Sequence, residues 1–278
     1  MPYCPLICTQ SLSDIINQEN LVLLDASIPA VGGGGPKPAG WPETAIKGAR
    51  RFDLKGEFSD QQSELSHTMP DQTQFQQAAR ALGVNNESQI VVYDDLGIYS
   101  SARAWWMFKA MGHQNIAVLD GGLPKWLAEQ REVEQAKTGL PELGNFIAKP
   151  QPGVFSQTQD VLAAIDNPDK VILDARAEQR FLGTSPEPRA GLRSGHIPSA
   201  KNLPYQQLLT QGQLLAKEVL QRKFKSVATN EQELVFSCGS GITACILALG
   251  AQVAGYEKLS VYDGSWAEWG IDPKLPIA

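Results

Sequence analysis

The sequence has few cysteines and few histidines: four Cys and three His among 278 residues. The cysteines stand at positions 4, 8, 238 and 245, in two distant pairs, without a CxxC motif and without a neighbouring histidine. This spacing matches no zinc site and argues against a disulfide framework. Because thiols stay reduced in the cytosol, we expect a cytoplasmic protein in which a cysteine in a special loop does chemistry.

Long apolar runs and an excess of positive charge are also missing. The richest apolar stretch, residues 244–256, is well short of the roughly 20 residues that cross a bilayer. The N-terminus has no basic region followed by an apolar run, so no secretory signal is indicated. A formal net charge of -6 provides no surface for nucleic acid or for an anionic membrane. We therefore predict a soluble protein with no nucleic-acid partner and no membrane partner.

The chain contains one pattern written twice. Four blocks of the first half recur in the same order in the second half. The matching blocks are LVLLDA (21–26) with KVILDA (170–175), AIKGARRFDL (45–54) with HIPSAKNLPY (196–205), IVVYDD (90–95) with ELVFSC (233–238), and VLDGGLPKW (118–126) with VYDGSWAEW (261–269). An ungapped alignment over the last two blocks sets Asp95 against Cys238. Since chance similarity does not keep four blocks in order, the sequence predicts two related domains.

Each half alternates short apolar strands with helical segments, which predicts an α/β fold with a mainly parallel sheet flanked by helices. Residues 137–156 contain several Pro and Gly and little periodicity, as a linker does. We predict a first domain at 1–136 without a catalytic cysteine, a linker at 137–156 and a catalytic domain at 157–278. A second Gly/Pro-rich stretch, 29–42, predicts a long surface loop.

The segment LVFSCGSGITACILALG sets Cys238 directly after a buried strand and before a helix. Two glycines, Gly239 and Gly241, let the backbone curl so that loop N–H groups point at one centre. The N-terminus of the helix, which contains Thr243 in its first turn, adds partial positive charge. Such a loop, with Ile242 completing it, favours a thiolate and holds the extra sulfur of a persulfide.

Other interpretations of the cysteines remain open. Cys238 could be a buried structural thiol, and that is the favoured interpretation for Cys245, two helical turns later. Cysteine-dependent phosphatases use the same strand-to-helix loop but close it with an arginine after five intervening residues. Ala244 occupies that position here, so phosphate lacks its bidentate partner and phosphatase activity is not expected.

With its two similar halves and the motif CGSGIT, the whole chain resembles the two-domain rhodanese superfamily, and its loop is similar to that of the 3-mercaptopyruvate sulfurtransferases. Thiosulfate sulfurtransferases of this superfamily usually have basic residues directly after the cysteine, where this chain has Gly239 and Ser240. A neutral loop with a hydroxyl suits a thiol donor better than the thiosulfate dianion. RFLGTSPEPR resembles the stretch whose arginines bind the donor's carboxylate and keto groups, which implies that Arg180 and Arg189 do so here.

The resemblance also implies roles in the first half. His67 stands at the place of the family's interdomain histidine, and Tyr99 and Arg103 lie in the loop that replaces the cysteine loop. Lys55 stands where mercaptopyruvate enzymes often have an acidic residue, so a Ser240–His67 proton relay lacks its carboxylate at that place.

Three further residues of the second half fit recurring rhodanese motifs but are expected to be structural. His196 lies in SGHIPSA, and Asp174 and Arg176 in LDAR are expected to form a local ion pair that supports the loop.

The resemblance implies a sulfurtransferase that moves sulfur from 3-mercaptopyruvate through a Cys238 persulfide to an acceptor thiol, including that of a thioredoxin-like protein, or to cyanide. Arg180 and Arg189 orient the donor, pyruvate leaves, and Ser240 with His67 assists the proton movement. No metal or organic cofactor is required. The alternatives are a thiosulfate:cyanide sulfurtransferase and, from a different class, a non-catalytic sulfur carrier or binding module.

Overall fold

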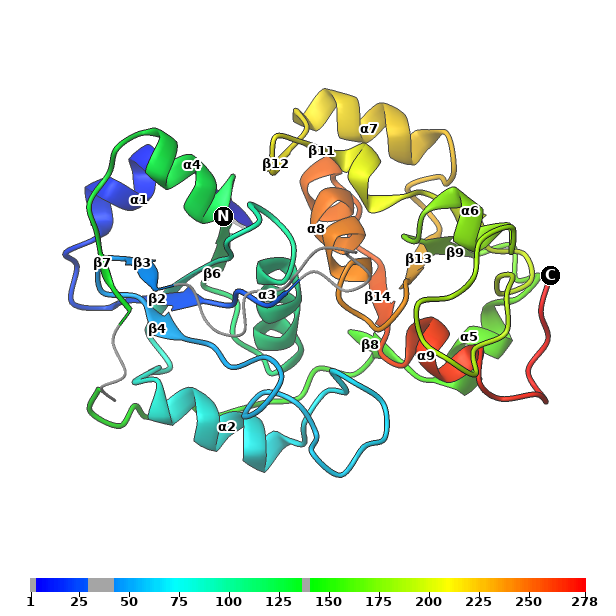
Figure 1. Cartoon of the computed structure of the whole chain (residues 1–278), viewed down its shortest axis with the longest axis horizontal. Helices are drawn as coiled ribbons and strands as arrows, with labels where there is room; N and C mark the ends of the chain where they lie inside the picture. Colours follow the sequence, from blue (N-terminus) through cyan, green and yellow to red (C-terminus); the bar gives the residue numbers. More distant parts are fainter. Residues whose placement is uncertain (1–3, 30–42, 137–140) are drawn as a thin grey trace. The chain divides into compact units, whose positions relative to one another are not determined.

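The computed structural model describes residues 4–29, 43–136 and 141–278 (Figure 1). They divide into two compact units, each with its own core. The first unit comprises Met1–Gln62, Met69–Gln151 and Gln211–Leu214, and the second comprises Ser63–Thr68, Pro152–Thr210 and Leu215–Ala278. The main change of unit, between residues 151 and 152, lies inside the predicted linker 137–156, while the predicted domain limits stay a prediction. The predicted surface loop, apart from Pro29, lies outside the described residues.

The first unit is built on a parallel five-stranded sheet in the order β1-β6-β5-β2-β4. Its strands are β1 (Leu6–Ile7), β2 (Leu21–Asp25), β4 (Arg50–Arg51), β5 (Gln89–Tyr93) and β6 (Ile116–Leu119). A separate antiparallel pair joins β3 (Thr44–Ile46) and β7 (Val133–Gln135). The central strands are buried on both faces, which is why they read as unbroken apolar runs.

Helices cover both faces of this sheet, as Figure 1 shows. The helices are α1 (Thr9–Ile15), α2 (Gln72–Ala81), α3 (Ser101–Ala110) and α4 (Gly122–Ala128). One core joins Leu12 of α1 and Trp126 of α4 to Leu23 of β2. On α2 and α3, Phe75 and Phe108 pack edge to face, with ring centroids 5.0 Å apart.

The second unit repeats this design with the sheet order β10-β9-β13-β14-β8, again parallel throughout. Its strands are β8 (Phe155–Ser156), β9 (Lys170–Asp174), β10 (Lys201–Asn202), β13 (Glu233–Ser237) and β14 (Leu259–Tyr262). A separate two-stranded sheet joins β11 (Leu209–Thr210) of this unit to β12 (Gln213–Leu214), which is assigned to the first unit. The helices of the second unit are α5 (Thr158–Ala164), α6 (Glu178–Phe181), the 3₁₀ helix η1 (Tyr205–Leu208), α7 (Lys217–Lys225), α8 (Ala244–Ala254) and α9 (Ser265–Trp269). The predicted α/β repeat is therefore confirmed.

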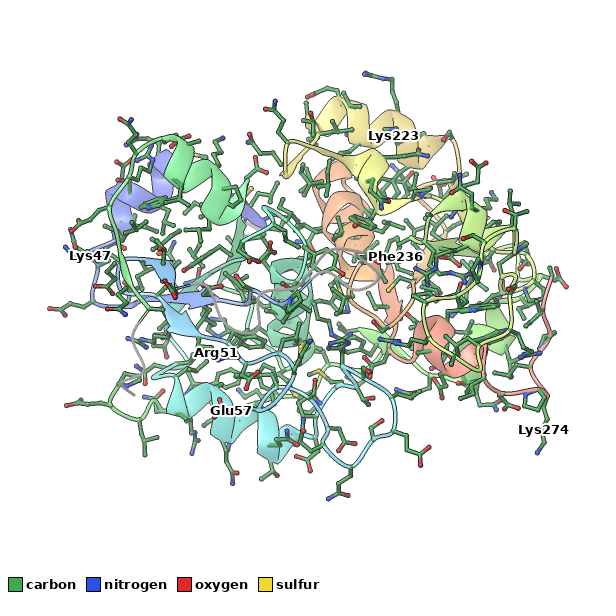
Figure 2. All side chains as sticks on the ribbon, in the orientation of Figure 1. Lys47, Arg51, Glu57, Lys223, Phe236 and Lys274 are labelled. Atoms are coloured by element: carbon green, nitrogen blue, oxygen red, sulfur yellow. The ribbon has the colours of Figure 1, made fainter. Side chains whose placement is uncertain are left out.

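Figure 2 shows the division between core and surface in the second unit. Phe236 of β13 lies inside and has no exposed surface, whereas Lys223 of α7 points outward. No helix within the described ranges is long and apolar enough to span a membrane.

In each unit, the pairing between two neighbouring strands shows which residues of the two halves correspond just before the cysteine loop. Asp25 pairs with Tyr93 in the first unit, and Asp174 pairs with Ser237 in the second. Because Asp25 and Asp174 end the matching segments LVLLD and KVILD, Tyr93 corresponds to Ser237.

The residue that follows is therefore Asp94 in the first unit and Cys238 in the second. The ungapped sequence alignment, which set Asp95 against Cys238, is wrong by one residue, because the first half has one residue more between this strand and the next. In the corrected register Gly97 and Gly241 correspond, and both have positive φ, 104° and 75°. Only glycine adopts this conformation readily, which explains why both loops contain it here.

Candidate active site

The cysteine loop of the second unit joins β13 to α8 and begins with Cys238, which is 1% exposed. Two backbone hydrogen bonds tie it to α9: Trp266 N donates to Cys238 O, and Ala267 N donates to Gly239 O, both at 3.0 Å. The cysteine is therefore held by main-chain contacts on a fixed part of the fold.

The N–H groups of the loop fall into two sets. Those of Cys238 and Gly241 donate to Ser265 Oγ, at 3.1 Å each. Four further loop amides have no acceptor among the residues that the structure describes: those of Gly239, Ser240, Ile242 and Thr243. Because an unpaired buried N–H is costly, a cluster of such groups at a helix N-terminus is suited to an anion.

The corresponding loop of the first unit shows what such amides can hold. Asp94 Oδ1 accepts from Leu96 N at 3.0 Å. Its Oδ2 accepts from Tyr99 N at 2.7 Å and from Ser101 N and Oγ at 2.9 and 2.6 Å. A negatively charged side chain at the position of Cys238 is thus bound by the loop that begins with it.

In the corrected register, which sets Asp94–Gly97 against Cys238–Gly241, Leu96 corresponds to Ser240. The extra residue of the first half follows Gly97, because α3 begins at Ser101 and α8 at Ala244. The amide of Leu96, which binds the carboxylate in the first unit, therefore corresponds to an amide without an acceptor in the second. The comparison indicates that the cysteine loop is shaped to hold a negative charge carried by the side chain of Cys238, as a thiolate or a persulfide.

Both predicted donor-binding arginines lie against this loop. A Cβ atom built on Gly239 would lie 3.2 Å from Nη2 of Arg180. Arg189 Nη1 lies 3.5 Å from Gly239 O. The structure thus brings Arg180 and Arg189 to the start of the cysteine loop, and their role in binding the donor stays a prediction.

A buried carboxylate, Glu187, links two arginines below the loop. Its Oε2 lies 2.5 Å from Nη2 of Arg180, and its Oε1 lies 2.9 Å from Nη1 of Arg176. Arg176 also pairs with Asp174 at 2.6 Å, so the ion pair predicted there is confirmed. These four charges cancel, and Arg189 is left to provide the net positive charge beside the cysteine.

The histidines lie in different settings. His67 is 6% exposed, has a φ of 67°, and belongs by its contacts to the second unit although it comes from the first half of the sequence. Lys55 is exposed and belongs to the first unit. His196 Nδ1 lies 2.9 Å from Phe181 O, and its ring stacks on Phe181 at 3.8 Å, which are the contacts of a structural side chain.

The remaining predicted residues of the loop are buried. Ser240 is 5% exposed and Ile242 is 1% exposed. Cys245 has no exposed surface, and its thiol donates to Gly241 O at 3.2 Å, so its predicted place in the core is confirmed.

Three residues near the loop escaped the sequence analysis. Ser265 could have been found by comparing DGS with DGG in the matching blocks, and Glu187 lies between the two arginines of RFLGTSPEPR. Tyr205, at the start of η1, has no comparable sequence signal. Burial and then the negative charge of Cys238 raise the pKa of Tyr205, which places its phenol in the surroundings of the sulfur.

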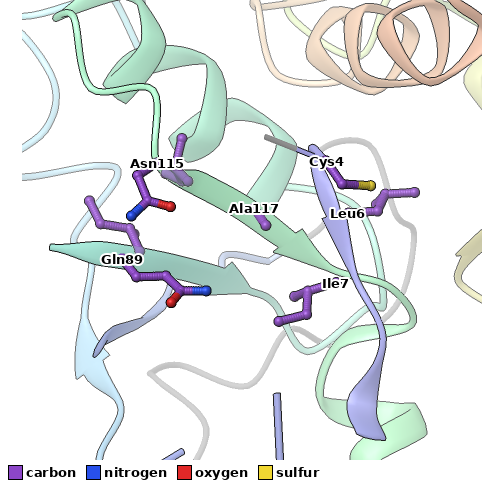
Figure 3. A pocket seen from close by; sticks show the side chains of 8 residues that line it. Cys4, Leu6, Ile7, Gln89, Asn115 and Ala117 are labelled. Atoms are coloured by element: carbon purple, nitrogen blue, oxygen red, sulfur yellow. The ribbon is translucent and has the colours of Figure 1, made fainter. Parts of the chain in front are cut away.

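The other pair of cysteines lies in the first unit, away from this loop in the sequence. Cys4 lines a cavity of about 230 Å³ between β1 and the starts of β5 and β6 (Figure 3). Cys8 precedes α1, where its Sγ accepts from Ser11 N at 3.4 Å, and the hydrogen bonds from Ser11 lower the pKa of the Cys8 thiol.

Two α/β units of one topology, with a cysteine in one loop and a carboxylate at the same place in the other, define a duplicated protein with a single thiol centre. The sequence model of the rhodanese-like domain matches residues 9–129 and 157–272. The chain therefore belongs to the rhodanese family and contains two rhodanese-like domains.

Named relatives agree with this assignment. The chain is 40% identical over 255 residues to a 3-mercaptopyruvate sulfurtransferase of Rattus norvegicus, covering 90% of this chain and 84% of the relative. It is 39% identical over 248 residues to the mitochondrial thiosulfate/3-mercaptopyruvate sulfurtransferase 1 of Arabidopsis thaliana, covering 81% of this chain and 65% of that relative, a little less than two thirds of its length. The crystal structure of SseA, a 3-mercaptopyruvate sulfotransferase of Escherichia coli, superposes with a TM-score of 0.84 at 30% identity over 95% of this chain and 99% of its own.

Proposed function

We propose that this protein is a 3-mercaptopyruvate sulfurtransferase that carries sulfur as a persulfide on Cys238. The observation that carries the proposal is the loop that begins at Cys238: four of its amides have no acceptor within the described residues, and its counterpart binds the carboxylate of Asp94. The named relatives of Rattus norvegicus and Escherichia coli support the choice of donor.

The reaction transfers one sulfur atom in two stages. The Cys238 thiolate attacks the donor's thiol sulfur, an S–S bond forms, and the C–S bond breaks with its electron pair going to carbon. The resulting enolate takes a proton and leaves as pyruvate. An acceptor then attacks the outer sulfur and regenerates the thiolate. The loop amides of Ser240 and its neighbours without an acceptor stabilise the negative charge in both stages, because the fold fixes them before the charge develops.

The cations beside the loop fit a small keto acid. Arg180 uses Nε and Nη2 on Glu187, which leaves Nη1 for a substrate oxygen. Within the described ranges, the guanidinium of Arg189 makes one hydrogen bond, the long contact of 3.5 Å to Gly239 O, so it can turn to the donor's carboxylate. Ser240 and His67 remain the proposed participants in proton movement, and the site residues require neither a metal nor an organic cofactor for this chemistry.

Thiosulfate is the second candidate donor, because the relative of Arabidopsis thaliana is named for both compounds. Against it, the two residues after Cys238 are neutral, so the dianion would depend on the arginines alone. An acceptor thiol, including that of a thioredoxin-like protein, or cyanide completes the proposed cycle. The cytoplasmic location expected from cysteine usage also stays a prediction.

The proposal is tested by comparing kcat/KM for 3-mercaptopyruvate and thiosulfate with cyanide as acceptor. We expect a higher value for 3-mercaptopyruvate and no turnover of either donor by Cys238→Ser, which preserves the volume of the side chain. A higher value for thiosulfate would make it the donor, and full activity of the Cys238→Ser variant would reject the cysteine mechanism. Absence of a persulfide with either donor would favour a binding module.

A further inference from the structure

Ser265, the first residue of α9, has an unusual backbone conformation directly beneath the cysteine loop. Its φ is 50° and its side chain has no exposed surface. A residue with a side chain is strained at positive φ, so glycine would fit this position better. Since the backbone disfavours serine here, the advantage of serine over glycine must come from its hydroxyl.

The hydroxyl of Ser265 uses its full hydrogen-bonding capacity within the loop. It accepts from the amides of Cys238 and Gly241, at 3.1 Å each, and donates to Tyr262 O at 2.8 Å. A hydroxyl has one proton and two lone pairs, so these three bonds satisfy it completely. Its oxygen also lies 3.9 Å from the sulfur of Cys238.

The first unit shows the same backbone without the hydroxyl. Gly122 corresponds to Ser265 in the matching blocks VLDGGLPKW and VYDGSWAEW, and its φ is 52°. A Cβ atom on Gly122 would lie 2.4 Å from Asp94 O and 2.5 Å from Gly97 O, so the loop of the first unit packs too closely against Gly122 to admit a side chain. The turn itself therefore needs no serine, and the unit that has the serine is the one that has the cysteine.

From this difference we propose that Ser265 is a positioning residue for the sulfur-carrying loop, an inference that rests on the proposed function. By holding the amides of Cys238 and Gly241, its hydroxyl fixes the curl of the loop, so that the four other loop amides stay directed at the sulfur of the thiolate or persulfide. Ser265 touches neither donor nor acceptor, and because its proton is given to Tyr262 O at the shorter distance, its effect on the sulfur passes through the loop.

The test compares Ser265→Gly with Ser265→Ala. Both variants lose the hydroxyl, but Gly relieves the backbone strain whereas Ala keeps it, so the glycine variant should have the higher Tm of the two. Both should lose about ten- to a hundred-fold in kcat, as expected for the loss of one or two hydrogen bonds that organise the site, with little change in donor KM. The pH profile for alkylation of Cys238, followed on its own peptide by mass spectrometry, should move to higher pH in both.

Ser260→Ala is the matched control. Ser260 is another buried serine of the second unit, on β14, and its hydroxyl is bonded to that of Ser156. Its loss should lower Tm and leave kcat and the alkylation profile unchanged.

Wild-type kcat together with a wild-type alkylation profile in Ser265→Gly would overturn the inference, as would equal kinetic loss in Ser260→Ala. If the wild-type protein forms no persulfide, the proposed function fails. The alkylation profile still decides the role of Ser265 in that case, because it needs no donor.

Discussion

Replacing Glu187 with Gln tests whether the buried carboxylate holds Arg180 in place beside the cysteine loop. The side chain of Glu187 is 1% exposed and accepts three hydrogen bonds, from Arg176 Nη1 at 2.9 Å and from Arg180 Nε and Nη2 at 3.2 and 2.5 Å. Removing one member of a buried ion pair costs about 3–5 kcal/mol. Because Arg176 keeps Asp174 and Arg180 is 26% exposed, we expect the lower end, a loss of about 3 kcal/mol in the free energy of unfolding.

The same substitution should affect binding of the donor. Without the carboxylate, the guanidinium of Arg180 is free to rotate, and we expect KM for 3-mercaptopyruvate to rise by about tenfold with a smaller change in kcat. Urea unfolding and steady-state kinetics measure the two effects. Glu178→Gln is the control, since Glu178 is an exposed carboxylate on α6, the helix that contains Arg180. A stability change below about 1 kcal/mol, within the range of exposed ion pairs, together with an unchanged KM would refute this role.

Three other substitutions probe separate parts of the account. Cys245→Ser should leave turnover nearly unchanged and lower stability slightly, because the hydroxyl can still donate to Gly241 O, and a loss of activity would show that Cys245 takes part in the reaction. Joint replacement of Gly239 by Arg and Ser240 by Lys adds positive charge beside the sulfur, so the ratio of kcat/KM for thiosulfate to that for 3-mercaptopyruvate should rise. An unchanged ratio would mean that Arg180 and Arg189 alone determine the choice of donor. Burial raises the pKa of Asp25 to about 6, so the protonated carboxyl stabilises the fold by about 3 kcal/mol below pH 4, and this contribution is lost as pH rises through 6. The Asp25→Asn variant should lack this fall in the free energy of unfolding between pH 4 and 7. An unaltered pH dependence of stability would contradict the assignment.

The sequence predicted the fold because its main signals are local and occur twice. Strands such as residues 21–25 and 170–174 are continuous apolar runs, and the cysteine loop is marked by its own glycines. The alignment failed by one residue because short apolar strands such as IVVY and LVFS match almost equally well in either register. Only the pairing of each strand with its neighbour fixes the register.

The supporting residues of the site could not be predicted in the same way. Glu187 matters because it is buried between two arginines, and Ser265 matters because two amides converge on its hydroxyl. Both facts depend on the return of distant segments to the loop, which no local pattern encodes. Cys238 and Arg180, by contrast, lie in motifs that can be recognised in the sequence alone.

The central claim is that Cys238 carries the transferred sulfur, and mass spectrometry of its peptide tests this claim most directly. After incubation with 3-mercaptopyruvate and no acceptor, the account predicts that the Cys238 peptide gains the mass of one sulfur atom, that Cys245 stays unmodified, and that cyanide removes the gain. Sulfur on another cysteine with Cys238 unmodified, or pyruvate release without any sulfur bound to the protein, would contradict it.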